Sequence, residues 1–167
     1  CLVAYLCARI PGTRVTLIDL DPARAAIAMA LNVDFASPDL ELPADHDLVF
    51  NASASGAGLN RALDLAGFEA TVMELSWFGT ASPTVALGGA FHSRRLTLKA
   101  SQVGYVAPER RARRSLRERL ALALSLCADP RLDVLVAAET PFDDIAARLG
   151  AILAAPETLC HLIRYPG

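Results

Sequence analysis

Asp19 is the residue whose position in the sequence most clearly suggests chemistry. It directly follows a short apolar, β-branched run at 15–18, and the pair Asp21 and Pro22 then starts a segment typical of a helix. In a dinucleotide-binding fold, the second strand ends in a carboxylate that accepts hydrogen bonds from ribose hydroxyls. Such a carboxylate repels a 2′-phosphate, so Asp19 favours NAD over NADP. The alternative is a turn or capping role before Asp21.

The glycine-rich phosphate loop of such a fold should precede this acid by about 20 residues. That spacing places the loop immediately before Cys1, and the sequence itself does not contain it. The chain also starts without Met, in a helical pattern, which predicts that an upstream part has been removed. We therefore expect an incomplete domain without its first strand and phosphate loop. NAD binding by this chain alone is expected to be weak or undetectable, and the chain alone to be inactive.

The elements that must position Asp19 alternate between helix and strand. Strands separated by single helices imply right-handed crossovers and a mainly parallel sheet, so the fold class is α/β, a doubly wound sheet of the Rossmann type. The patterns predict strands at 15–18, 47–51, 70–75, 95–101 and 158–165, and helices at 2–10, 21–31, 58–66, 115–127 and 140–154.

Three of these patterns carry more detailed expectations. Gly67 is expected to close the helix 58–66, and the alternation in 95–101 suits an edge strand with one face less buried. Thr140 and Pro141 are expected to open the last helix. We assign residues 1–128 to the incomplete dinucleotide-binding domain and 129–167 to a C-terminal helix and strand.

Composition and charge limit the classes of partner. With 53% hydrophobic residues in 167, the chain can bury a substantial core, and a net charge of −2 gives no general attraction for nucleic acid or anionic lipid. Six arginines lie in 110–119, but no aromatic residue accompanies them, which favours a solvated helix start over a nucleic-acid patch. No segment approaches the roughly 20 apolar residues of a membrane span. We expect a cytoplasmic protein without nucleic-acid or membrane partners.

The cysteines and histidines do not have the spacing of a metal site. No two cysteines form a CxxC pair, and their apolar surroundings favour free, buried thiols. The three histidines are far apart in the sequence, so we expect no zinc site in this chain. The residues concerned are Cys1, Cys7, Cys127, Cys160, His46, His92 and His161.

Three stretches of sequence resemble medium-chain, zinc-type alcohol dehydrogenases. The run VTLIDLDPARAAIAMALNVDFA is similar to the family's ribose-binding stretch, and Asp19 and Arg24 match its acidic and basic positions. The run LVFNASASGAGLNRALDLAGFEATVMELSWFG is similar to the following strand, polar turn, helix, glycine and strand. RLTLKASQVG is similar to the last sheet strand with its glycine. The match covers about residues 1–105, and the final helix and strand fit the family's return to its catalytic domain.

The resemblance implies cofactor contacts at the strand ends. Asp19 and Arg24 would touch the adenosine ribose, and the remaining contacts would lie near adenine (Ala52, Ser53), the nicotinamide ribose (Leu75, Ser76, Trp77) and the carboxamide (Ser101, Gln102, Val103). Trp77 departs from the smaller aliphatic residue expected there. The alternatives are capping or turn roles for Ser53 and Ser55 and a core role for Trp77.

The resemblance also implies a function. The parent protein would be an oxidoreductase that moves hydride between NAD and an alcohol or carbonyl substrate. Its zinc would be held by a preceding domain, and subunits would pair through the edge strand 95–101. Two alternatives stay open: an S-adenosylmethionine-dependent methyltransferase, against which the NASAS turn argues, and a non-catalytic Rossmann domain for assembly or nucleotide sensing.

Overall fold

The computed structural model describes residues 1–155 and 158–166. The chain forms two compact units: unit 1 comprises 1–40 and 117–167, and unit 2 comprises 41–116. The division into an incomplete dinucleotide-binding domain at 1–128 and a C-terminal helix and strand at 129–167 stays a prediction. Residues 156, 157 and 167 of the second segment lie outside the described residues.

Unit 1 combines short helices with two separate pairs of parallel strands. β1 pairs with β2, with Thr16 opposite Asp34, and β6 pairs with β7. Tyr5 and Leu132 are at the centre of its buried cluster. The elements are α1 (Leu2–Ala8), β1 (Thr16–Ile18), α2 (Arg24–Ala30), β2 (Asp34–Ala36), α5 (Leu116–Cys127, in this unit from Arg117), the 3-10 helix η2 (Pro130–Leu135), β6 (Val136–Pro141), the 3-10 helix η3 (Phe142–Asp144), α6 (Ile145–Ala154) and β7 (Cys160–Arg164).

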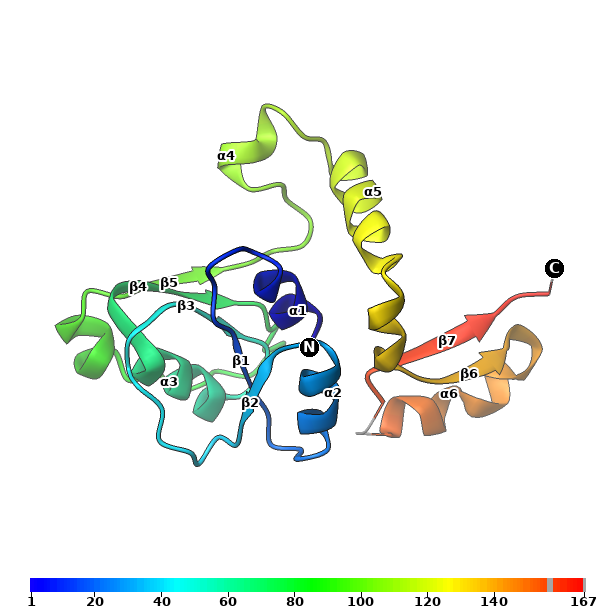
Figure 1. The fold of residues 1–167 in the computed structure, drawn as a ribbon, viewed down its shortest axis with the longest axis horizontal. Coiled ribbons are helices and arrows are strands. Elements are labelled where there is room, and N and C mark those ends of the chain that lie inside the picture. Colours follow the sequence, from blue (N-terminus) through cyan, green and yellow to red (C-terminus); the bar gives the residue numbers. More distant parts are fainter. Residues whose placement is uncertain (156–157, 167) are drawn as a thin grey trace. The chain divides into compact units, whose positions relative to one another are not determined.

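Unit 2 contains a three-stranded parallel sheet in the order β3-β4-β5 (Figure 1). Leu59, Ala62 and Leu63 recur at helical spacing, so α3 presents one apolar face, and this face packs with Val72 of the central strand. The elements are β3 (His46–Asn51), α3 (Gly56–Leu65), β4 (Ala66–Glu74), the π-helical turn η1 (Leu87–Phe91), β5 (Thr97–Ala100) and α4 (Pro108–Arg111).

Most of the predicted elements are confirmed. The strands expected at 15–18, 47–51, 70–75, 95–101 and 158–165 correspond to β1, β3, β4, β5 and β7, and every strand pair in the described residues is parallel. β5 lies at the edge of its sheet, as its alternation indicates. The predicted α/β class with a mainly parallel sheet is therefore confirmed.

Two strands escape the sequence patterns. β2 has three residues, too few to show a period, although it pairs with β1 over its whole length. Thr140 and Pro141 were expected to open a helix, but they end β6 instead. Thr140 is 1% exposed in that strand, and the helical segment begins only with Phe142. The Thr-Pro pair therefore lies directly before the helix start.

Two expected helix ends are also corrected. α3 ends at Leu65, and Gly67 lies inside β4 rather than closing the helix. A Cβ at Gly67 would lie 3.0 Å from the carbonyl carbon of Asp45, so glycine is needed there for close approach of two backbones. α2 begins at Arg24, while Asp21 accepts a hydrogen bond from the Ala23 N–H at 2.9 Å and caps the preceding turn.

A charged cluster fastens α1 to the segment that follows α5. The Asp129 carboxylate accepts hydrogen bonds from the buried Tyr5 hydroxyl at 2.5 Å, from Arg9 at 2.8 Å and from Arg131 at 2.7 Å. Both guanidinium groups lie over the Tyr5 ring, 5.5 and 5.3 Å from its centroid. The Arg131 side chain, and next the Tyr5 hydroxyl, hold the pKa of Asp129 well below its usual range.

Asp129 should therefore make unit 1 less stable in acid. An aspartate with a lowered folded pKa stabilises the fold fully above its unfolded pKa of about 3.9, and this contribution disappears as the pH falls through the folded pKa. We expect Asp129→Asn to unfold more easily at neutral pH and to lose less stability in acid than the wild type. Urea unfolding at several pH values measures this. The control is Asp133→Asn, which alters an exposed carboxylate; an unchanged acid dependence in Asp129→Asn would contradict the assignment.

Candidate functional site

Asp19 follows β1 directly, at the carboxyl end of that strand. Its backbone N–H donates to the Ala36 carbonyl at 3.4 Å and prolongs the pairing with β2. Its Oδ1 accepts a hydrogen bond from the Asp21 N–H at 2.9 Å. Oδ2 has no partner within residues 1–155 and 158–166. The turn role is thus confirmed for one oxygen, while the other can still accept a hydrogen bond from a ligand.

Arg24 and the start of α1 lie close to this carboxylate. The Arg24 side chain is only 9% exposed, and its Nε lies 3.5 Å from Asp21 Oδ2. Burial lowers the pKa of the Cys1 amino group, the charge of Asp19 opposes this shift, and the charge of Arg24 adds to it. The structure pairs Arg24 with Asp21, and the joint contact of Asp19 and Arg24 with a ribose stays a prediction.

In unit 2, two polar residues that the sequence analysis did not select join the carboxyl ends of β3 and β4. The buried Asn51 donates from Nδ2 to Glu74 Oε2 at 2.7 Å. Glu74 Oε1 accepts from the Ser76 N–H at 2.7 Å, and the Asn51 carbonyl accepts from the Leu75 N–H at 2.9 Å. Each of the two residues is the polar end of an apolar strand, which is the signal that could have identified them. The pair fixes the backbone from which the candidate contacts extend.

The serine turn after β3 is held by its own side chains. The Ser53 hydroxyl donates to Asn51 Oδ1 at 2.8 Å, and Ser55 Oγ caps α3 by accepting from the Gly58 N–H at 3.0 Å. A Cβ at Gly58 would lie 2.0 Å from Ser53 Oγ, so this turn requires glycine at the first turn of the helix. The turn and capping alternatives are therefore confirmed for Ser53 and Ser55, and Ala52 lies exposed beside them.

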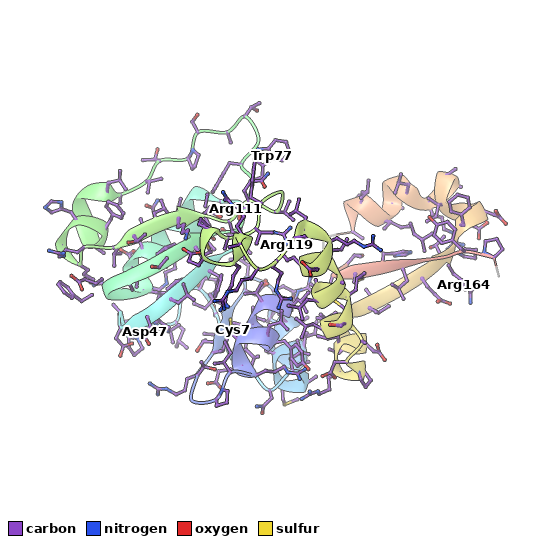
Figure 2. The ribbon with its side chains drawn as sticks, turned by 90° about the horizontal axis from the view of Figure 1, so that it is seen from above. Cys7, Asp47, Trp77, Arg111, Arg119 and Arg164 are labelled. Atoms are coloured by element: carbon purple, nitrogen blue, oxygen red, sulfur yellow. The ribbon has the colours of Figure 1, made fainter. Side chains whose placement is uncertain are left out.

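The residues after β4 reach the same turn. Ser76 Oγ accepts a hydrogen bond from the Ala54 N–H at 2.9 Å, which connects the ends of β3 and β4 a second time. Leu75 is half-buried. Trp77 is 89% exposed on the loop after β4 (Figure 2), so the alternative that it is a core aromatic is wrong. Its exposure leaves the ring accessible to a ligand.

The residues after β5 form an exposed loop. The Ser101 N–H donates to the Glu74 carbonyl at 2.8 Å and ties this loop to the end of β4. The Gln102 side-chain oxygen accepts a hydrogen bond from the Gly104 N–H, and Val103 is 80% exposed. All predicted contacts of unit 2 thus follow the carboxyl ends of parallel strands, the edge at which open α/β sheets bind ligands.

The histidines and cysteines do not gather into a metal site among the described residues. In the part of the chain that the structure describes, no three His, Cys, Asp or Glu side chains gather as metal ligands would. His46 Nδ1 is engaged with the Leu65 carbonyl at 3.1 Å, and His161 Nε2 with Thr140 Oγ1 at 2.8 Å. No helix among the described residues is both long and apolar enough to cross a membrane.

Solved structures with a similar fold include several dehydrogenases. No protein-family model matches the sequence, and no curated protein matches it significantly. L-idonate 5-dehydrogenase from Escherichia coli superposes with a TM-score of 0.76 at 15% identity, over 98% of this chain and 46% of that chain. This chain shares its fold with these dehydrogenases. The 2R,3R-butanediol dehydrogenase from Bacillus subtilis gives 0.74 at 17% identity, over 99% and 47%.

A third solved structure with a similar fold carries a cofactor. TarJ from S. aureus in complex with NADPH gives a TM-score of 0.74 at 14% identity, over 99% of this chain and 52% of that chain. The chain spans about half the length of the three solved structures. At these identities the likeness establishes the fold. The resemblance to zinc-type medium-chain alcohol dehydrogenases that the sequence indicates is thereby confirmed at the level of the fold.

Proposed function

We propose that this chain is the cofactor-binding part of an NAD-dependent oxidoreductase that transfers hydride between nicotinamide and an alcohol or carbonyl substrate. The observation that carries the proposal is Asp19. It directly follows a parallel strand in a fold shared with dehydrogenases, and one of its oxygens has no partner among the residues that the structure describes. A carboxylate in that place suits the hydroxyls of an adenosine ribose.

The choice of NAD over NADP rests on charge. A 2′-phosphate next to Asp19 would bring two negative groups together, whereas a ribose diol can donate to the carboxylate. The positive charge of Arg24 does not favour a 2′-phosphate, because its side chain is buried and its Nε lies beside Asp21. The NADPH of TarJ belongs to a protein that is 14% identical, so the fold alone permits either cofactor.

The strand-end groups of unit 2 have supporting roles in this proposal. NAD would supply the nicotinamide ring that accepts or gives the hydride. Asn51 and Glu74 would keep the strand ends rigid, and the contacts themselves would come from Ala52, Ser53, Leu75, Ser76, Trp77, Ser101, Gln102 and Val103. Because the Ser53 hydroxyl is used within its turn, we assign Ser53 a backbone rather than a side-chain contact.

The proposal assigns no role to zinc in this chain, and it includes pairing of two copies of the chain. The described residues offer no set of ligands that fits zinc, so no step is assigned to a metal here. The exposed edge strand β5 is the proposed contact with a second copy of the chain, because its outer backbone groups are not paired within the sheet.

A titration followed by amide NMR tests the function. We expect millimolar NADH to shift the resonances of Asp19 and its neighbours saturably, although weakly, because the sequence has no glycine-rich loop to hold the pyrophosphate. S-adenosylmethionine should cause no such shift. Binding of S-adenosylmethionine at Asp19 would support the methyltransferase alternative instead.

A further inference from the structure

A cavity lies at the opposite end of unit 2's sheet, where β4 and β5 begin. It is a hollow of about 550 Å³ that is largely open to solvent. Glu69, on this cavity, and Glu74, at the strand-end network, are five residues apart on β4. The cavity is therefore separate from the candidate cofactor contacts. Its lining residues are Glu69, Phe91, His92, Arg95, Leu96 and Thr97.

Two of the lining residues have a left-handed backbone conformation, which residues other than glycine rarely adopt. Glu69 has a φ of +58° and Arg95 a φ of +54°, and neither is glycine. The Glu69 N–H donates to the Arg94 carbonyl at 2.7 Å and the Arg95 N–H to the His92 carbonyl at 3.2 Å, so both conformations are fixed by hydrogen bonds. Left-handed backbone costs free energy for such residues and is concentrated at functional sites. Two strained residues that face one cavity point to a use for that cavity.

The same two residues form an ion pair that contributes little to stability. Arg95 Nε lies 3.0 Å from Glu69 Oε1, and the two side chains are 72% and 56% exposed. Exposed pairs of this kind stabilise a fold only slightly. The pair instead orients the Arg95 side chain, because Glu69 binds its guanidinium group at Nε. The two terminal nitrogens of Arg95 have no protein partner within residues 1–155 and 158–166.

The neighbouring Arg94 shows how a structural arginine behaves in this fold. Its Nη1 donates to the carbonyls of Asp64 and Ala66 at 2.8 and 3.0 Å, which closes the carboxyl end of α3. Arg95 makes no comparable contact with a helix end. Its planar pair of terminal N–H groups has the geometry that binds an oxyanion through two parallel hydrogen bonds.

We propose that this cavity binds a small organic monocarboxylate. The carboxylate would lie on the terminal nitrogens of Arg95, with a ring N–H of His92 as a further donor, and the apolar part would lie against Phe91 and Leu96. Glu69 is close to the bound anion and repels additional negative charge, which favours a monoanion over a dianionic phosphate. The proposal is independent of the proposed NAD binding. The cavity lies where β4 and β5 begin, whereas the candidate NAD contacts of unit 2 follow the carboxyl ends of the strands.

Titration of the 167-residue chain with benzoate, and separately with inorganic phosphate, tests the proposal by amide NMR. Benzoate should cause saturable shifts at residues 69 and 91–97, and phosphate should bind at least several-fold more weakly. Arg95→Gln should weaken benzoate binding by about tenfold or more, since hydrogen bonds to a charged group are lost. Arg113→Gln, which removes an exposed arginine of the same unit, should leave the affinity unchanged.

A second variant separates binding from folding. Arg95→Gly relieves the left-handed strain, so its melting temperature should not fall while its benzoate binding is lost. Shifts that do not saturate, equal benzoate affinities for Arg95→Gln and Arg113→Gln, or phosphate binding as tight as benzoate binding would each overturn the proposal. Addition of NADH should leave the benzoate affinity unchanged, so failure here and failure of the NAD proposal can be told apart.

Discussion

Replacing Asp19 by alanine is expected to lower the affinity for NADH by about 10- to 100-fold, because the hydrogen bond that Oδ2 would accept, a bond to a charged group contributing about 1.5–3 kcal/mol, is lost. In a chain that binds NADH only weakly, this loss makes the saturable shifts around β1 disappear. The measurement is the same NMR titration, carried out on the wild type and the variant. Asp39→Ala, which removes an exposed carboxylate of the same unit, should bind NADH as the wild type does.

Asp19→Asn distinguishes the two roles of this side chain. The amide oxygen can still accept the Asp21 N–H and keep the turn after β1, whereas the negative charge is lost. Affinity for NADH should therefore fall less than in the alanine variant, and the preference for NADH over NADPH should shrink because the repulsion of the 2′-phosphate is gone. If the wild type bound NADPH and NADH equally, or if Asp19→Ala bound NADH normally, the assignment of Asp19 to the ribose would be wrong.

The sequence was most informative where a strand is apolar and ends abruptly in a polar residue. Asp19 after β1 is such a case, and the runs that became β3 and β4 are others, because a buried parallel strand needs a continuous apolar stretch and a polar group can appear only where the strand reaches the sheet edge. The order of these elements along the chain then sufficed to predict the parallel α/β fold.

What the sequence did not reveal depends on contacts between distant residues. Asn51 and Glu74 are 23 residues apart, and their hydrogen bond arises only when β3 and β4 pair in register. The Glu69–Arg95 pair is similar, and no residue type signals its left-handed backbone, since glutamate and arginine rarely adopt it. Thr140 in β6 was mistaken for a helix start because threonine before proline is also a helix signal.

Replacing Tyr5 by alanine should be among the most destabilising single changes in unit 1. Tyr5 is 1% exposed, and its removal leaves a cavity and deprives Asp129 of a donor, so we expect a loss of about 3–5 kcal/mol in the free energy of unfolding, as for other large buried aromatics. Tyr5→Phe removes only the hydroxyl and should cost about 1–2 kcal/mol. Chemical denaturation followed by the resonances of unit 1 measures both values.

Tyr5→Ala and Tyr5→Phe together test whether the cluster around Asp129 also positions the start of α1. Leu20→Ala, which alters a side chain that is 87% exposed in the same unit, should leave stability nearly unchanged. If the cluster holds α1 in place beside Asp19, Tyr5→Phe should stay folded and yet weaken NADH binding measurably, because α1 is fastened to the Asp129 segment through this hydroxyl. Equal stability of Tyr5→Ala and Leu20→Ala would show that Tyr5 does not anchor the helix.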